Sequence, residues 1–135
     1  MAVLVTTDDE LWALCDWREA RGESDEAKLG VAYVIHNRAT DKKKRWPASI
    51  RGVILQPWQF SSFNQNDPNY TKYPEPDEKA WLACKAAVEK VKAGAEDPTK
   101  GANLYHSIPV GKPWPKWAQP ELLTAVIGPF RFYKS

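Results

Sequence analysis

The chain has 135 residues, a length typical of a single compact domain with one core. Its 19 basic and 17 acidic residues leave a net charge of +2, which is too balanced to predict nucleic-acid binding by itself. The N-terminal apolar run is short and no basic residue precedes it, so we expect neither a secretory signal peptide nor a membrane span. Seven tryptophans and five tyrosines are many for this length, and such an excess often lines a groove that stacks on sugars, bases or peptides.

The first helix is predicted over residues 8–21. Thr7 and Glu10 have the spacing of a capping box at its start, and Gly22 is expected to end it. Glu19 then lies in the last turn, where the negative end of the helix dipole and burial both raise the pKa of a carboxyl group. That is the direction a general acid needs.

A second helix, capped by Ser24 or Asp25, is predicted to run to about Thr40, and its apolar stripe indicates the central buried helix. The basic run 41–45 that follows is interpreted as an exposed turn. After a short helix, the polar and aromatic segment 56–70 is longer than a plain connection requires, and such loops usually carry function.

A third main helix is predicted over residues 76–94, and the segment 102–107 alternates like a strand. Prolines keep the following stretch extended and display Trp114, and residues 122–133 have the pattern of a terminal hairpin. Helices first and strands last predict an α+β fold, mostly helical, with a small C-terminal antiparallel β region. We expect one domain over residues 1–135.

The two cysteines, Cys15 and Cys84, fall on apolar helix faces. This pattern predicts two buried free thiols, while a disulfide between the two helices stays open. No cysteine–histidine cluster has zinc-binding spacing, and no glycine pattern for a nucleotide is present. We therefore expect no metal and no cofactor.

Glu19 is the best candidate for chemistry, although a helical glutamate more often faces solvent. Three roles are open for Glu23: a second carboxylate of the site, a partner for Arg21, or simply a residue in the first turn of the next helix. His106 is open to a binding role, and Ser61 lacks the context of a serine nucleophile. Carboxylate chemistry with aromatic platforms is typical of glycan cleavage, in which a glutamic acid protonates the glycosidic oxygen and rings stack on sugars.

Six separated segments match the motifs of one family, in order, between about residues 10 and 133. They are Glu19-Ala20-Arg21-Gly22-Glu23, Val34-Ile35-His36-Asn37-Arg38, Trp46-Pro47 with Val53-Ile54, Gln59-Phe60-Ser61, Gly94 with Asp97-Pro98-Thr99 and Gly101-Ala102, and Ile127-Gly128 with Phe132-Tyr133. Together they resemble the SleB/CwlJ-type cell wall hydrolases, whose best-known members degrade spore cortex peptidoglycan. The resemblance implies a lysozyme-like domain that cuts the bond between N-acetylmuramic acid and N-acetylglucosamine as a lytic transglycosylase.

The resemblance also implies a site in which Glu19 is the catalytic acid. Arg21 and Glu23 are expected to orient Glu19 or hold the substrate, and His106 to contribute to binding. The other expected contacts to the glycan are hydrogen bonds from Gln59, Ser61 and Tyr105 and ring stacking on Trp58, Phe60 and Trp114.

The expected partner is the glycan strand of bacterial peptidoglycan, with no nucleic acid, no stable membrane association and a monomeric protein. Synthesis in the cytoplasm without a signal peptide suits a phage endolysin that reaches the cell wall through a pore made by another protein.

Two alternatives stay open. A hydrolytic lysozyme needs a second carboxylate, for which Glu23 and Asp67 are the candidates. A catalytically silent module that binds glycan or nucleic acid is the other, and it uses the aromatic excess and the basic run 42–45. An amidase is disfavoured because no zinc ligand set is visible.

Overall fold

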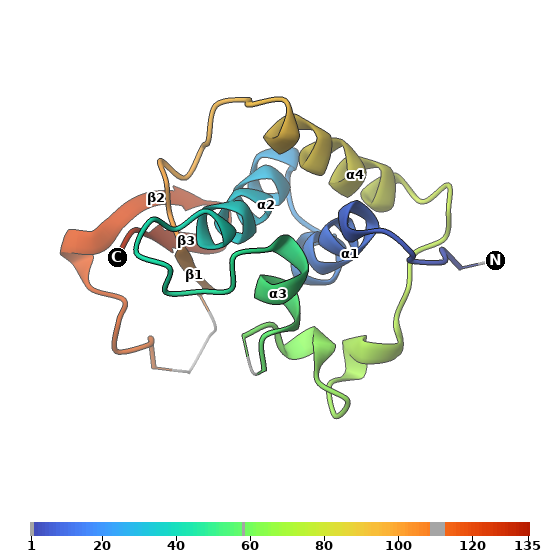
Figure 1. The fold of residues 1–135 in the computed structure, drawn as a ribbon, viewed down its shortest axis with the longest axis horizontal. Coiled ribbons are helices and arrows are strands. Elements are labelled where there is room, and N and C mark those ends of the chain that lie inside the picture. Colours follow the sequence, from blue (N-terminus) through green and yellow to red (C-terminus); the bar gives the residue numbers. More distant parts are fainter. Residues whose placement is uncertain (1, 58, 109–112) are drawn as a thin grey trace.

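The structure is a computed structural model that describes residues 2–57, 59–108 and 113–135. The helices are α1 (Asp8–Ala20), α2 (Asp25–Ala39), α3 (Ile50–Leu55) and α4 (Lys79–Lys92), and the strands are β1 (Leu104–Ser107), β2 (Leu123–Ile127) and β3 (Phe130–Tyr133). In Figure 1 the helices α1 and α4 lie on one side and the sheet on the other, with α2 between them. The predicted α+β fold with a small C-terminal antiparallel sheet is confirmed.

Side-chain caps set the starts of α1 and α2. Thr7 Oγ1 accepts from the Glu10 amide at 3.1 Å, and the Glu10 carboxylate accepts from the Thr7 amide at 3.0 Å, which confirms the predicted capping box. Helix α1 ends at Ala20, but Gly22 does not adopt the positive φ of a typical glycine cap. The next helix instead begins at once, because the Ser24 hydroxyl caps α2.

Helix α2 is the central element, as predicted, because it packs against α1, α3, α4 and the sheet. One apolar core fills the space between the helices, and a second joins the end of α1, α2 and the strands. Cys15 and Cys84 are both fully buried and unpaired, so the expected free thiols are confirmed.

The sheet has the order β1-β3-β2 and is antiparallel throughout. Tyr105 lies opposite Phe132, and His106 lies opposite Arg131. Gly128 turns the chain between β2 and β3 at φ +56°, a conformation that suits glycine. The sheet thereby brings the aromatic residues of β1 and β3 against the ends of α1 and α2.

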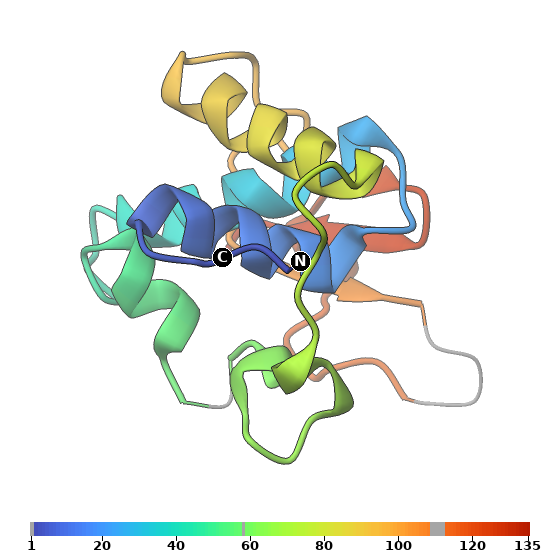
Figure 2. The same cartoon turned by 90° about the vertical axis from the view of Figure 1, so that its right-hand side faces the viewer.

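Two irregular segments extend from the same side of the molecule, below the helices in both views (Figures 1 and 2). We call residues 59–74 the long loop and residues 113–119 the proline segment. None of the helices in the described ranges combines the length and hydropathy that crossing a bilayer requires.

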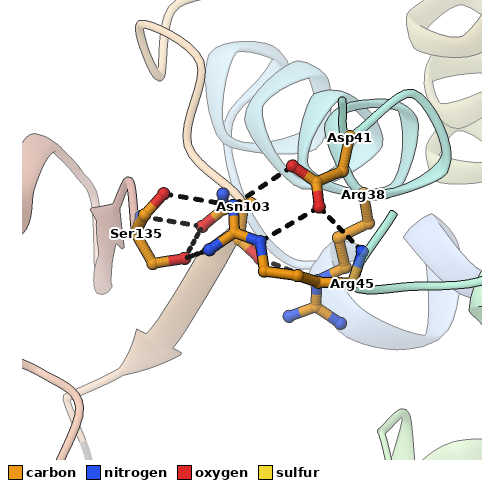
Figure 3. Close-up of polar contacts among 5 residues, drawn as sticks. All are labelled: Arg38, Asp41, Arg45, Asn103 and Ser135. Carbon is orange, nitrogen blue, oxygen red and sulfur yellow. Dashed lines mark hydrogen bonds and ion pairs between the residues drawn. The ribbon is translucent and has the colours of Figure 1, made fainter. Parts of the chain in front are cut away.

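The basic run after α2 is exposed at its lysines, as expected, but its last residue has a structural role. Arg45 forms an ion pair with Asp41 at 3.0 Å and donates to the Ser135 hydroxyl at 2.9 Å (Figure 3). Asn103 accepts hydrogen bonds from the Ser135 amide and hydroxyl, each at 3.1 Å. This group fastens the residues after β3 to the turn after α2.

Candidate active site

A cleft of about 770 Å³ opens where the ends of α1 and α2 meet β1, the long loop and the proline segment. It contains seven of the residues expected to form a site, and it brings together parts of the chain that lie far apart in sequence. Its lining includes residues 18–23, Arg38, residues 59–60 and residues 105–107.

Glu19 is a half-buried residue in the wall of this cleft. Burial raises its pKa, and the negative charge of Asp67 acts in the same direction. A hydrogen bond from the Tyr105 hydroxyl and the positive charge of Arg38 oppose that rise in pKa. Glu19 therefore keeps its proton to higher pH than an ordinary glutamate, and it keeps partners that stabilise its charged form.

Tyr105 was expected to bind the glycan, but its hydroxyl donates a hydrogen bond to Glu19 Oε1. The ring is held by Phe130 and Phe132, with centroids at 5.5 and 5.8 Å. Burial and then the charge of Glu19 raise the pKa of Tyr105 well above its ordinary value, so the phenol remains a donor. Tyr105 thus fixes Oε1 as an acceptor oxygen, so we expect a proton on Glu19 to be carried by Oε2.

Arg18 anchors the long loop to α1. Its Nε, Nη1 and Nη2 donate to the carbonyl oxygens of Lys72, Ser62 and Tyr70 at 3.2, 3.2 and 2.9 Å. Arg18 is only 6% exposed, and all three of its side-chain nitrogens have acceptors. The long loop, whose length suggested a functional role, is therefore fixed to the helix that carries Glu19.

Arg21 and Glu23 both line the cleft, but they do not form an ion pair with each other. Arg21 lies over the Trp17 ring at 4.5 Å and donates to Asn69 Oδ1 at 3.1 Å, so it also holds the long loop. Glu23 is half-buried, and its carboxylate faces the β2–β3 turn at Gly128. Of the two, Glu23 has the freer side chain for a substrate.

The residues of the long loop differ in their access to the cleft. Gln59 is exposed and lines it, whereas Ser61 is exposed and lies outside the lining. Phe60 borders the cleft, but the residue is only 3% exposed and packs in the helical core, so the expected stacking on a sugar does not fit its burial. Trp58 lies outside the described residues.

His106 and Trp114 form an aromatic wall beside β1. His106 lines the cleft, with Nε2 2.9 Å from the Tyr133 hydroxyl and Nδ1 2.8 Å from the Ser107 carbonyl oxygen. Trp114 stands next to the lining at 5.2 Å from the His106 ring, with the Arg131 guanidinium 4.8 Å over its ring. Since 46% of Trp114 is exposed, its position suits a rim platform for a sugar.

Sequence reasoning missed Arg38, which lies in the cleft lining although its helical stripe suggested only a core position. Its Nε donates to the Asn103 carbonyl oxygen at 2.7 Å. The neighbouring Asn37 donates to Asp97 Oδ2 at 3.0 Å and to the Ala102 carbonyl oxygen at 2.8 Å. Two signals pointed to it: an arginine among the apolar residues of a buried helix, where a charge needs partners, and its place in the family motif at residues 34–38.

The two candidates for a second carboxylate are placed differently. Glu23 lines the cleft, whereas Asp67 does not, and Asp67 Oδ1 accepts from the Asn69 amide at 2.8 Å. Asp67 still lies close enough to Glu19 for its charge to raise the pKa of Glu19. Among the described residues, no three histidine, cysteine or acidic side chains gather in a group that could hold a metal ion.

The cell wall hydrolase family matches residues 22–133, a stretch that begins just beyond Glu19. The spore cortex-lytic enzyme of Halalkalibacterium halodurans is 30% identical over 115 residues, and that of Bacillus subtilis is 32% identical over 117 residues. Each alignment covers 85% of this chain but 32% and 34% of the respective relatives, so the chain spans about a third of the length of these curated relatives.

Two solved structures share the fold over nearly the whole chain. The catalytic domain of the germination-specific lytic transglycosylase SleB from Bacillus anthracis superimposes with a TM-score of 0.74 at 27% identity, over 97% of both chains. The catalytic domain of the Bacillus cereus SleB protein superimposes with a TM-score of 0.69 at 29% identity, over 94% of this chain and 89% of that one.

Proposed function

Because the chain belongs to the cell wall hydrolase family, we propose that it cleaves bacterial peptidoglycan as a lytic transglycosylase, with Glu19 as the acid and base. The observation that carries the proposal is the position of Glu19, which is half-buried in the cleft, hydrogen-bonded by Tyr105 and raised in pKa by burial. The similar Bacillus anthracis domain, whose name describes a lytic transglycosylase, supports the reaction type.

In the first step the protonated Glu19 gives its proton to the glycosidic oxygen between N-acetylmuramic acid and N-acetylglucosamine. The bond from the muramic acid C1 to that oxygen breaks, and N-acetylglucosamine leaves with a new hydroxyl. The Glu19 carboxylate that remains is stabilised by the Tyr105 hydrogen bond and by the Arg38 charge.

In the second step the same carboxylate removes the proton from the muramic acid C6 hydroxyl. The C6 oxygen bonds to C1 and closes a 1,6-anhydro ring, which restores the protonated Glu19. No water is consumed, and no second carboxylate is needed, because the sugar supplies its own nucleophile.

A hydrolytic lysozyme is the second candidate, and the influence of Asp67 on the pKa of Glu19 is the observation that favours it. A second carboxylate about 5–9.5 Å from the acid can act as nucleophile or activate a water molecule. Glu23 in the cleft wall is the alternative for that role.

The deciding experiment is digestion of purified peptidoglycan followed by mass spectrometry of the soluble products. Anhydro-muropeptides support the transglycosylase, whereas reducing ends identify a hydrolase. Glu19→Gln should abolish product release with an unchanged near-ultraviolet circular dichroism spectrum, and full activity in that variant refutes the assignment. A binding module releases no products even as the unmodified protein.

The biological setting that we propose is lysis of the cell wall as a phage endolysin. Production in a bacterial cytoplasm with and without a co-produced pore-forming holin tests this role. Lysis that depends on the pore supports it, and lysis without the pore contradicts it.

A further inference from the structure

We propose that Arg38 forms a subsite for an acyl oxygen of the glycan strand, with its guanidinium donating to a carbonyl or carboxylate oxygen bound beside Glu19. This inference rests on the proposed function, because it takes peptidoglycan as the substrate. Two groups of the glycan strand carry such oxygens: the N-acetyl groups of both sugars and the lactyl group of muramic acid.

The first observation is a buried donor without an acceptor. Arg38 is only 6% exposed, and its Nε is used by the Asn103 carbonyl oxygen at 2.7 Å. Among the described residues no acceptor reaches its Nη1. A buried donor that stays unpaired costs about 1–3 kcal/mol, so such groups are rare unless water or a ligand completes them.

Among the described residues, Arg131 Nε is also buried without an acceptor, but only Arg38 of the two lines the cleft. Two further arginines are fully paired. Arg18 is equally buried at 6% exposure, yet all three of its nitrogens donate to carbonyl oxygens of the long loop. Arg45 shares the Trp46 ring with Arg38, at 4.9 and 5.6 Å from the centroid respectively. Each Arg45 nitrogen donates to Asp41 or Ser135.

Figure 3 shows how the two arginines beside Trp46 differ. The guanidinium of Arg45 points into the group formed by Asp41, Asn103 and Ser135, whereas the terminal nitrogens of Arg38 point away from that group. Arg38 instead lines the cleft that contains Glu19. The two arginines therefore differ: Arg45 has all its nitrogens paired, whereas Arg38 lines the cleft and has an unpaired Nη1.

The surroundings of Arg38 favour a planar acyl oxygen as the acceptor. The Trp46 and Phe60 rings lie 5.6 and 5.5 Å from its guanidinium carbon and hold the group in place. Arg38 and Glu19 form no ion pair, so the guanidinium is not occupied by the acid. A charged guanidinium bonds strongly to carboxylate oxygens and also donates to neutral carbonyl oxygens, as Arg18 does in this protein. Arg38 would therefore fix the sugar next to the acid.

The test measures binding in the Glu19→Gln background by isothermal titration calorimetry, so that turnover does not interfere. One ligand is chitotetraose, which carries only N-acetyl groups. The other is the peptide-free tetrasaccharide of alternating N-acetylglucosamine and N-acetylmuramic acid, which adds lactyl carboxylates. Arg38→Gln is the test variant, and Arg45→Gln is the matched control on the same tryptophan.

We expect Arg38→Gln to weaken binding of the muramic acid tetrasaccharide about tenfold, which corresponds to about 1.4 kcal/mol, while Arg45→Gln leaves it within about twofold. If Arg38→Gln weakens binding of both ligands, the acceptor is an N-acetyl oxygen. If it weakens binding of the muramic acid tetrasaccharide alone, the acceptor is the lactyl carboxylate. Unchanged binding in folded Arg38→Gln, equal loss in Arg45→Gln, or no binding of either ligand overturns the subsite.

If Arg38→Gln does not fold, Arg38→Lys keeps the positive charge between the rings but loses the guanidinium fork. It should weaken tetrasaccharide binding at least about threefold, and unchanged binding overturns the subsite. The two proposals fail separately, because peptidoglycan digestion tests the reaction and these titrations test only recognition. Arg38-dependent binding without any turnover overturns the catalytic proposal and leaves the subsite standing.

Discussion

Asp16 and Glu19 are acidic residues three positions apart on α1, close to one turn of the helix. Burial is the largest cause of a raised pKa in both. Asp16 is 0% exposed and lies in the interior near Lys28 and the Cys84 thiol. Glu19 is half-buried, lines the cleft and accepts a hydrogen bond from Tyr105.

The difference shows that a raised pKa does not by itself mark a catalytic residue. Among the described residues, no nitrogen or oxygen donor reaches either carboxyl oxygen of Asp16, so ionisation there is costly and no substrate has access. Glu19 combines the raised pKa with access to a cleft and with partners for its charged form. Proton transfer needs all three properties.

The largest expected effect is loss of catalysis in Glu19→Gln. We expect cleavage of peptidoglycan to fall by about 10²–10⁴-fold, because an amide keeps the acceptor for Tyr105 but cannot give up a proton. Asp16→Asn makes the same chemical change inside the protein and should leave the rate within about threefold. Release of soluble muropeptides under identical conditions measures both, and similar losses in the two variants contradict the distinction.

Tyr105→Phe should change the pH dependence of the reaction and lower the rate about tenfold. The Tyr105 hydrogen bond lowers the pKa of Glu19, so its removal raises that pKa further. Activity requires protonated Glu19 and is lost as pH rises through its pKa, so the alkaline limb should move to higher pH. The lower rate follows from weaker stabilisation of the carboxylate, by about 1.5 kcal/mol.

The control for Tyr105→Phe is Tyr133→Phe. The Tyr133 hydroxyl lies 2.9 Å from His106 Nε2 and makes no hydrogen bond to Glu19. Tyr133→Phe should therefore leave the alkaline limb of the pH profile in place. An unmoved limb in Tyr105→Phe, or an equal shift in both variants, contradicts the assignment of Tyr105 as a positioning residue.

Local sequence signals predicted most of the fold. The capping box at Thr7, the cap at Ser24 and the apolar spacing of the main helices act within a few residues, and each is found in the structure. The position of Glu19 in the last turn follows from the same short-range pattern. The α4 start at Lys79, a few residues later than expected, lies at an end without a side-chain cap.

The internal contacts of the site could not be predicted in the same way. Tyr105 reaches Glu19 across a sequence separation of 86 residues, and Arg38 reaches Asn103 across 65 residues. Such contacts depend on how β1 packs against the ends of α1 and α2, which no local pattern encodes. The same reason explains Phe60, whose aromatic ring suggested a sugar platform but fills the core.

Asp16→Asn should flatten the pH dependence of stability. The pKa of Asp16 in the folded protein lies above the value of about 3.9 in an unfolded chain. Between these two pKa values the folded state therefore holds a proton that the unfolded chain has lost. The free energy of unfolding is not reduced by Asp16 below about pH 4, and it falls as pH rises through this window. Urea unfolding at several pH values measures the slope.

We expect Asp16→Asn to recover about 1 kcal/mol or more of the stability that the protein loses between acidic and neutral pH. The variant keeps the size of the side chain and removes the carboxyl group, whose ionisation in the buried site costs free energy. Glu19→Gln is the control, and it should change this slope less, because Tyr105 and Arg38 already stabilise the Glu19 carboxylate. Parallel curves for Asp16→Asn and the unmodified protein contradict the prediction.

The smallest expected effect concerns Gly22, which lines the cleft beside Glu19. An added Cβ meets no atom within 4 Å, and the backbone φ is not positive, so Gly22→Ala fits the fold and should stabilise it by about 0.5 kcal/mol. The methyl group enters space that a glycan would occupy, so cleavage should slow about threefold. At Gly30 the same Cβ lies 3.0 Å from Phe132 Cζ, so Gly30→Ala should destabilise the protein instead. Urea unfolding and product release on both variants check the contrast, and a destabilised Gly22→Ala contradicts it.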